Sequence, residues 1–253
     1  MAGILDGKKI VVMGVANKKS IAWGCTQAFL KQGAQVILTY QNDRMKRSIE
    51  RFVPENTPLV ECDVSEDKNV EATFKEIGEK YGKVDGLIHA IAYADKETLT
   101  NDFIDTTKAG YDLAQNISAY SLISVCRYAK EILNDPASIM TMTYFGSTRA
   151  IPNYNMMGVA KAALEANVRY LARDLGKSNI RVNAISAGAL KTLAVTGIKN
   201  HKSLLDTSKD LTVNKKAVTV DEVGNLAAFL MSDMSSGLTG DIIYCDKGVH
   251  LLV

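Results

Sequence analysis

The sequence predicts a doubly wound α/β domain of the Rossmann type, built on a parallel sheet of about seven strands. Near-continuous apolar strands alternate with helices, which is typical of a parallel sheet covered on both faces. The chain has 253 residues, which is long enough for one such domain. No low-complexity linker or internal repeat divides it, so we expect a single domain over residues 1–253.

The first elements alternate between strand and helix. Residues 8–13 (KKIVVM) form a short, β-branched run that ends at Gly14, which predicts the first strand. Residues 20–32 are expected to form a helix that stops before a glycine. The apolar run 34–40 (AQVILTY) predicts the second strand, and a helix is expected over 43–52. This order is typical of a βαβ unit.

The same alternation continues through the middle of the chain. Residues 58–62 (PLVEC) predict a third strand, which Asp63 closes, and a helix follows over about 66–81. The apolar run 84–92 (VDGLIHAIA) predicts the fourth strand. A long helix is expected across 111–133. His89 lies in the apolar fourth strand with no partner carboxylate in view, so we interpret it as a core histidine.

The carboxyl-terminal half completes the sheet. Residues 138–144 (SIMTMTY) predict the fifth strand, and an apolar stripe from Leu164 to Leu175 supports a helix over about 154–177. A strand is then expected at 180–186, followed by a long polar stretch from 187 to 216. The last elements are a helix at 221–231 and a strand at 241–246. The carboxyl ends of parallel strands meet at one edge, where we expect the ligand site.

Composition and charge exclude several other classes of protein. The chain is 47% hydrophobic and 23% charged, which is typical of an ordinary globular protein. The net charge of +2 gives no electrostatic reason to expect nucleic acid or a membrane surface as a partner. The apolar run 10–16 is too short for a signal or spanning segment, so we expect a cytoplasmic protein. The cysteines lack metal-ligand spacing, which predicts four free thiols and no metal site.

The loop after the first strand has the features of a nucleotide site. Neither common glycine fingerprint is present, but Gly14, Ser20 and Gly24 line a longer loop that opens a helix. Ser20 can cap this helix, and its free N–H groups would face a pyrophosphate. An ordinary turn and an ordinary helix cap would explain these residues equally well.

The next two strand ends bear on the choice of nucleotide. Gln41 follows the second strand, where an acid would bind an adenosine ribose and a base would accept a 2′-phosphate. No Arg or Lys occupies this position, which favours NADH. NADPH stays open because Arg44, Lys46 and Arg47 lie close by, although these would also suit a solvated helix face. Asp63 can accept from the adenine amino group while Val64 packs on the ring, or it can cap the following helix.

Tyr154 and Lys161 are the candidate catalytic pair. They are seven residues apart on one predicted helix, and two turns of about 3.6 residues bring them to nearly the same face. A tyrosine there can donate to an oxygen where negative charge develops, and a lysine can bind a nicotinamide ribose. This spacing is also common on amphipathic helices without a catalytic role.

The chain resembles the bacterial enoyl-acyl-carrier-protein reductases of the FabI type, a divergent family of short-chain dehydrogenases. The resemblance rests on Tyr-x6-Lys, on the G-x5-S-I-A-x-G loop, and on segments such as TYQND (39–43), RAIPNYN (149–155) and RVNAISAG (181–188). It extends from Gly7 to about Gly248. It implies reduction of the C2=C3 double bond of a trans-2-enoyl thioester on acyl carrier protein, in type II fatty acid synthesis, by a homotetramer.

The resemblance also assigns roles to residues. It implies that Tyr154 donates to the thioester carbonyl, that Lys161 holds the nicotinamide ribose, and that Tyr144 lines the acyl pocket. The source of the C2 proton stays open between tyrosine and water. The implied cofactor contacts are Gly14, Ser20, Ile21, Gln41, Asp63, Val64, Ala90, Ile91, Ala92, Lys161 and Thr192. The implied acyl contacts are Tyr144, Met157, Ala194 and Ile198.

The segment from about 188 to 216 is the candidate substrate lid, since long loops in compact domains are usually functional. Between 191 and 216 there are six lysines against two acids. We therefore expect acidic acyl carrier protein to dock near Lys199 and Lys202, unless this is only a solvated loop. The chain departs from many members of the family by having Ala189, Val213 and Lys247 in place of Pro, Pro and Gly.

Two other functions fit the same fold. A short-chain reductase acting on C=O is less favoured, because Thr141 stands thirteen residues before Tyr154, where such enzymes carry a catalytic serine. A non-catalytic sensor of dinucleotides is the second alternative. Retention of both Tyr154 and Lys161 argues against it, although the fold alone does not exclude it.

Overall fold

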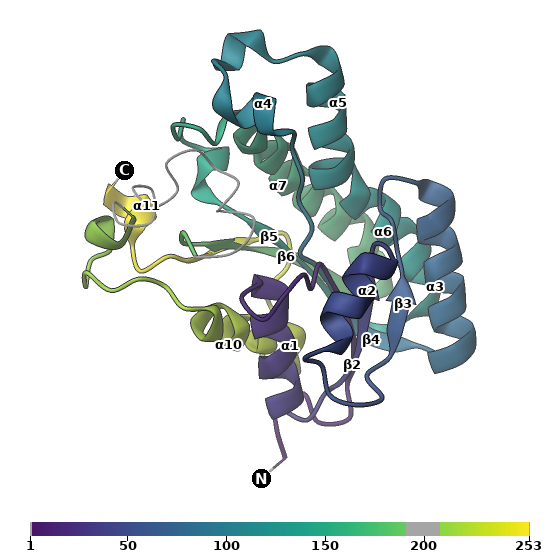
Figure 1. The fold of residues 1–253 in the computed structure, drawn as a ribbon. Coiled ribbons are helices and arrows are strands. Elements are labelled where there is room, and N and C mark those ends of the chain that lie inside the picture. Colours follow the sequence, from purple (N-terminus) through teal and green to yellow (C-terminus); the bar gives the residue numbers. More distant parts are fainter. Residues whose placement is uncertain (1, 191–207, 253) are drawn as a thin grey trace.

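A parallel sheet forms the centre of the molecule. The computed structural model describes residues 2–190 and 208–252, and within them one sheet has seven strands in the order β3-β2-β1-β4-β5-β6-β7 (Figure 1). Every neighbouring pair is parallel. The strands are β1 (Lys9–Met13), β2 (Gln35–Tyr40), β3 (Leu59–Glu61), β4 (Val84–His89), β5 (Leu133–Thr143), β6 (Ile180–Ala187) and β7 (Ile242–Cys245). This confirms the predicted doubly wound sheet.

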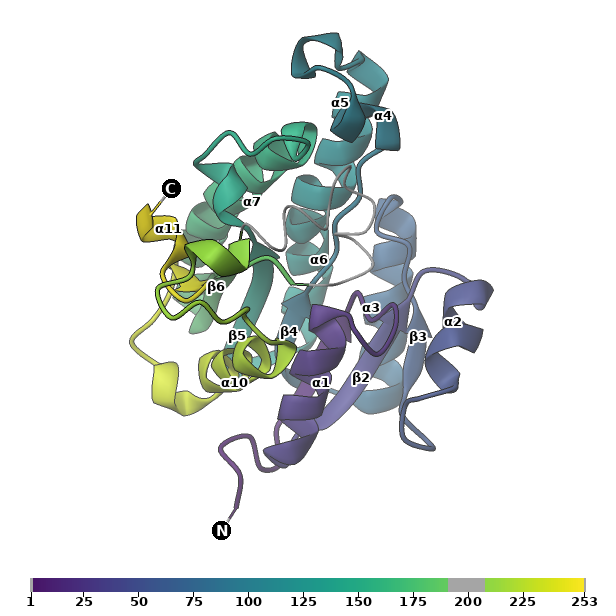
Figure 2. The ribbon, with the colours of Figure 1, turned by 60° about the vertical axis from the view of Figure 1, so that its left-hand side comes forward.

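Helices cover both faces of the sheet (Figures 1 and 2). One face carries α1 (Ile21–Lys31), α2 (Asp43–Glu50) and α10 (Val220–Met231). The other carries α3 (Asp67–Tyr81), α6 (Ser121–Ala129) and α7 (Asn155–Leu175). Each face has its own apolar core, and successive residues of a strand contribute to different cores. In β1, Ile10 and Val12 belong to the core under α1, whereas Val11 and Met13 belong to the core under α3.

The predicted helix over 111–133 is not continuous. It is divided into α5 (Lys108–Gln115), a π-helical turn η2 (Asn116–Tyr120), α6 and a 3-10 turn η3 (Lys130–Ile132). The Asn167 side-chain amide of α7 donates to the Ala119 carbonyl oxygen of the π-helical turn at 3.0 Å. Interruptions of this kind depend on contacts between helices, which periodicity along the chain does not report.

Other boundaries also differ from the expectation. The strand predicted at 84–92 ends at His89, so the Ala90–Ala92 segment leaves the sheet. The strand predicted at 138–144 begins at Leu133. Two short helices were not predicted, α4 (Lys96–Thr100) and α11 (Val249–Leu252). The remaining 3-10 turns are η1 (Phe103–Asp105), η4 (Phe145–Ser147), η5 (Gly176–Ser178) and η6 (Asp233–Ser235). α4 and α5 project together at the top of both views (Figures 1 and 2).

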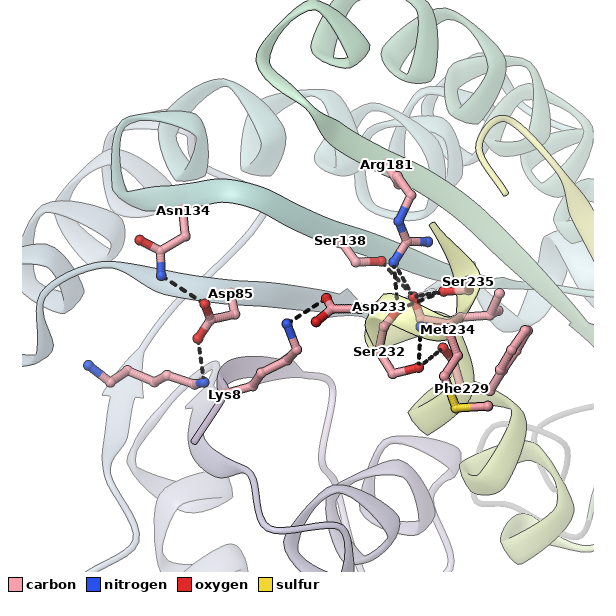
Figure 3. Close-up of polar contacts among 12 residues, drawn as sticks. Lys8, Asp85, Asn134, Ser138, Arg181, Phe229, Ser232, Asp233, Met234 and Ser235 are labelled. Carbon is pink, nitrogen blue, oxygen red and sulfur yellow. Dashed lines mark hydrogen bonds and ion pairs between the residues drawn. The ribbon is translucent and has the colours of Figure 1, made fainter. Parts of the chain in front are cut away.

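A polar network ties the amino ends of the strands to the end of α10 (Figure 3). Arg181, at the start of β6, donates to the Leu230 and Ser232 carbonyl oxygens at 2.9 and 3.2 Å. The Ser138 hydroxyl also donates to the Leu230 oxygen, at 2.9 Å. Lys8 forms an ion pair with Asp233 at 2.8 Å. The guanidinium and hydroxyl groups thus satisfy carbonyls that a helix end leaves without partners.

Three expectations from sequence concern the cysteines, membrane-spanning segments and metal sites. All four cysteines are free thiols, as predicted, and burial raises the pKa of Cys25 and Cys126 to about 12 and that of Cys62 to about 11. None of the helices described is long and apolar enough to cross a membrane. Within 2–190 and 208–252, no group of three or more His, Cys, Asp or Glu side chains could hold a metal ion.

Candidate active site

Gly14 marks the point where the order of the strands reverses, between β1 and β4. Its φ is +95°, and a Cβ at this position would overlap the Ala90 carbonyl oxygen. The Ala90 N–H donates to the Met13 oxygen at 3.2 Å, so the two strand ends stay in contact. Only glycine fits here, and its missing side chain leaves the backbone open to a ligand at the switch point.

Ser20 caps α1 as predicted. Its hydroxyl oxygen accepts from the Trp23 N–H at 3.3 Å and its O–H donates to the Asn17 oxygen at 2.8 Å. Ile21 is the first residue of the helix. The first turn of α1 therefore begins at the carboxyl edge of the sheet beside Gly14, and N–H groups at a helix start bind pyrophosphate well.

Gln41 and Asp63, which follow two different strands, lie together. The Gln41 side-chain amide donates to one Asp63 oxygen at 3.2 Å, and the Ser65 N–H and O–H donate to the other at 3.0 and 2.8 Å. Burial alone would raise the pKa of Asp63, but these hydrogen bonds lower it below its usual value. The carboxylate stays charged and can accept from an adenine amino group. Val64 is buried in the core under α3.

The Ala90–Ala92 segment leads from β4 to Tyr93, and a serine of the π-helical turn holds it there. The Ser118 hydroxyl accepts from the Tyr93 N–H at 2.9 Å and donates to the Tyr93 oxygen at 2.8 Å. Ser118 is fully buried. Sequence reasoning missed this residue because no motif links a serine in a helix to a loop 25 residues earlier.

Tyr154 and Tyr144, two of the predicted site residues, are in contact. Their ring centroids are 5.0 Å apart in an edge-to-face arrangement. Burial raises the pKa of Tyr144 to about 12, with a further contribution from Asp246. Burial also raises the pKa of Tyr154 well above its usual value, and Tyr144 and Glu165 raise it further. Both phenols therefore stay protonated near neutral pH and can donate a hydrogen bond.

Two glycines make room for the Tyr154 ring. A Cβ at Gly146 would lie 2.6 Å from the ring, and a Cβ at Gly158 would lie 2.7 Å from the Gly146 oxygen. η4 can thus pack directly on the start of α7, where Tyr154 occupies the N-cap position. Sequence reasoning did not single out either glycine.

Lys161 lies two turns into α7 with only 6% of its surface exposed. Its ammonium group donates to the Met142 carbonyl oxygen of β5 at 2.8 Å. Burial lowers the pKa of Lys161 to about 8, and the negative charge of Glu165 opposes this shift. The structure therefore places the predicted phenol at the N-cap of α7 and the ammonium two turns into that helix, against the carboxyl end of β5.

Glu165 is a buried acid that the sequence analysis missed. It is 8% exposed and accepts from the Thr143 hydroxyl at 2.7 Å. The available signal was an acid within the apolar stripe of the 154–177 helix. His89, in contrast, is the core histidine predicted: it is fully buried, its ring nitrogens bond Thr141 and Ser121, and burial lowers its pKa to about 3.

Met157, a predicted acyl contact, is buried in α7, one turn from Tyr154. Other predicted site residues lie outside the described part of the chain. The residues outside the description are Thr192, Ala194, Ile198, Lys199 and Lys202, with most of the candidate lid. Between β7 and α11, Lys247 has a φ of +54°, at a position where the resemblance led us to expect glycine. Its ammonium group pairs with Glu222 and donates to the Ala217 oxygen, both at 2.9 Å, which holds it in this conformation.

Comparison with known proteins now decides the family. A family model described as enoyl-(acyl carrier protein) reductase matches residues 14–250. The chain belongs to this family. An enoyl-acyl-carrier-protein reductase of Enterococcus faecalis, named as an NADH enzyme, is 58% identical over 247 residues, which cover 98% of this chain and 99% of that protein. The corresponding enzyme of Escherichia coli is 43% identical, with 98% and 96% covered.

Solved structures of the family agree with the fold. The reductase of Bacillus cereus, in complex with NADP+ and an indole naphthyridinone, superimposes with a TM-score of 0.96 at 43% identity, over 99% of both chains. That of Anaplasma phagocytophilum, in complex with NAD, has a TM-score of 0.94 at 40% identity, over 99% of this chain and 97% of that chain. The resemblance found in the sequence is thus confirmed.

Proposed function

We propose that this enoyl reductase transfers a hydride from NADH to C3 of a trans-2-enoyl group carried by acyl carrier protein, in the last step of an elongation cycle of type II fatty acid synthesis. The observation that carries the proposal is the convergence at one sheet edge of two protonated tyrosines and a buried lysine with the Gly14 loop. The family match over residues 14–250 supports the same reaction.

The residues at the strand ends fit a dinucleotide. Gly14 and the start of α1 would accept the pyrophosphate, and Asp63 with Gln41 would take the adenosine end. Lys161 would hold the ribose hydroxyls beside the nicotinamide. The segment Ala90–Ala92 would pack along the cofactor, with Ile21, Val64 and Thr192 as further contacts. NADH supplies the hydride when it is bound.

Tyr154 is the proposed electrophilic catalyst. As the hydride reaches C3, negative charge develops on the thioester oxygen and an enolate forms. Because its raised pKa keeps the Tyr154 phenol protonated, it can donate a hydrogen bond to this oxygen and stabilise the enolate. C2 then takes up a proton, which saturates the bond. Tyr144 and Met157 would line the acyl side with Ala194 and Ile198.

The test follows NADH absorbance with a crotonyl thioester and then with an enoyl carrier-protein substrate. We expect Tyr154→Phe to lower kcat by roughly 10²–10³-fold, because it removes the donor to the enolate. Tyr170→Phe is the matched control, since this tyrosine of the same helix is 69% exposed. Absence of NADH oxidation by the wild-type protein, or equal loss in both variants, would contradict the proposal.

The same assay addresses the nucleotide. We propose NADH, because Gln41 is uncharged and Lys46 of α2 makes other contacts. Lys46 lies 4.0 Å from Glu50 and 5.8 Å from the centre of the Tyr40 ring. A higher kcat/KM with NADPH than with NADH would overturn this choice.

We also propose how the enzyme meets its partners. Acyl carrier protein would dock near Lys199 and Lys202, beside a substrate lid at about 188–216, and the working form would be a cytoplasmic homotetramer of single-domain chains (residues 1–253). The lysine excess between 191 and 216 supports the docking site, because acyl carrier proteins are acidic. Replacing both lysines by Glu should raise KM for the carrier-linked substrate but not for crotonyl-coenzyme A.

A further inference from the structure

Helix α7 carries a buried carboxylate beside the proposed catalytic lysine. Glu165 follows Lys161 by four residues, so the two side chains share one face of the helix. Both are almost completely buried, with 8% and 6% of their surfaces exposed. A charged group is costly to bury unless other groups compensate it, and an acid on the same buried face as a base can compensate the charge of that base.

The carboxyl end of β5 contacts both side chains. The Met142 carbonyl oxygen accepts from the Lys161 ammonium group at 2.8 Å, and the next residue, Thr143, donates its O–H to Glu165 at 2.7 Å. Thr143 pairs in register with Ser186 of β6, whose buried hydroxyl has no hydrogen-bond partner among the described residues. The surface of the sheet under Lys161 and Glu165 is therefore polar rather than apolar.

We propose that Glu165, oriented by Thr143, is a positioning residue that keeps the Lys161 side chain charged and in place for the cofactor ribose. The inference rests on the proposed role of Lys161. A threonine hydroxyl has one hydrogen to donate. Thr143 donates it to Glu165, and this hydrogen bond holds the carboxylate in one position. The Lys161 ammonium group donates to Met142, the residue before Thr143 in β5. The carboxyl end of β5 therefore positions both Lys161 and Glu165.

The charges around Lys161 support this role. Burial lowers its pKa to about 8, and Glu165 is the charge that raises it. His89 approaches from β4, but burial and the charge of Lys161 lower its pKa to about 3, so it is neutral. Tyr154 on α7 and Tyr144 at the end of β5 have raised pKa values and are neutral too, and Asp246 after β7 acts on Tyr144.

Glu165→Gln provides the sharpest test, because glutamine keeps the size and the acceptor oxygen for Thr143 and removes only the charge. NMR of isotope-labelled lysine in the cofactor-free protein would follow the titration of Lys161. We expect a midpoint near pH 8 in the wild type and a decrease of at least about one pH unit in the variant. The alkaline limbs of NADH binding and of kcat/KM should move by the same amount.

Asp174→Asn is the matched control, since this acid of α7 is exposed. Thr143→Val should shift the Lys161 titration in the same direction as Glu165→Gln, and Thr143→Ser should restore it. This pair tests the inference even if the glutamine variant does not fold. An unchanged Lys161 midpoint in a folded Glu165→Gln or Thr143→Val protein would overturn the inference.

Lys161→Met separates this inference from the proposed function. If this variant binds NADH as the wild type does and retains full activity, the proposed role of Lys161 is wrong. If Lys161→Met abolishes activity while Glu165→Gln leaves the titration and the pH profiles unchanged, only the role of Glu165 is wrong.

Discussion

The Tyr154 ring occupies a space that two glycines leave open. A Cβ at Gly146 would lie 2.6 Å from the ring and would displace it. We therefore expect Gly146→Ala to lower kcat by roughly 10²-fold, which is the scale of a 1 Å misplacement of a catalytic group. NADH binding should change little, because Gly146 is not among the proposed cofactor contacts. Stopped-flow kinetics and NADH fluorescence titration would measure the two effects.

Gly176→Ala provides the control for that substitution. Gly176 ends α7, and no atom outside its immediate chain neighbours lies within 4 Å of a Cβ placed there. A normal kcat for Gly146→Ala would mean that η4 can move away without disturbing the phenol.

Buried His89 makes the stability of the fold depend on pH. Its pKa is about 3 in the folded protein, against about 6.5 in an unfolded chain. Between these values the unfolded chain binds a proton that the folded protein does not, so the free energy of unfolding falls as the pH decreases below about 6.5. The slope from this residue is at most about 1.4 kcal/mol per pH unit.

Urea unfolding of the wild type and His89→Gln between pH 7 and pH 5 would measure this dependence. We expect a shallower decrease of stability in the variant, even if it is less stable at pH 7. Parallel curves for the two proteins would show that His89 does not cause the dependence.

The residues of the site differ in how far the sequence determines them. Gly14, Ser20, Tyr154 and Lys161 were predicted because their roles depend on a local motif or on helical spacing. Ser118 and Glu165 were missed, because they contact Tyr93 and Thr143, which lie on other elements. No local pattern identifies such contacts.

At the scale of elements, Arg181 links β6 to the end of α10. Its guanidinium donates to the Leu230 and Ser232 oxygens (Figure 3). It also donates to the Leu238 oxygen at 3.3 Å. We expect Arg181→Met to lower the free energy of unfolding by about 1–3 kcal/mol, because carbonyls at the end of the helix lose a charged donor. Arg173→Met, on the exposed side of α7, should have little effect in the same urea titration. Equal stability of both variants would contradict this account of Arg181.

The sequence predicted the elements better than their ends. All seven strands and the long helices α1, α3, α7 and α10 lie where apolar periodicity placed them. The π-helical turn inside the 111–133 helix was not predicted, because contacts such as that of Asn167 in α7 with the Ala119 carbonyl leave no pattern along the chain. The short helices α4 and α11 were missed because four or five residues give too little periodicity.

For the whole molecule, the exposed carboxyl-terminal helix bears on the proposed homotetramer. Leu251 and Leu252 of α11 are 71% and 55% exposed in the single chain. We expect light scattering to give four times the 27.5 kDa chain mass for the wild type. Leu251→Glu should give smaller species, because an interface would have to bury its charge.

Ile104→Glu provides the comparison, since Ile104 is 90% exposed on η1. A monomeric wild type would contradict the tetramer itself. A tetramer that persists in Leu251→Glu would instead place the interface elsewhere on the surface.

The division of the interior by the sheet has a consequence for how substitutions combine. Ile10 and Val11 are adjacent in the chain, yet their side chains lie in different cores on opposite faces of β1. Energies of substitution add when two sites share no contacts, and they interact when the side chains touch. Neighbours along a strand should therefore behave additively, whereas compensating pairs should join residues far apart in sequence, such as Val11 and a side chain of α3 or α6.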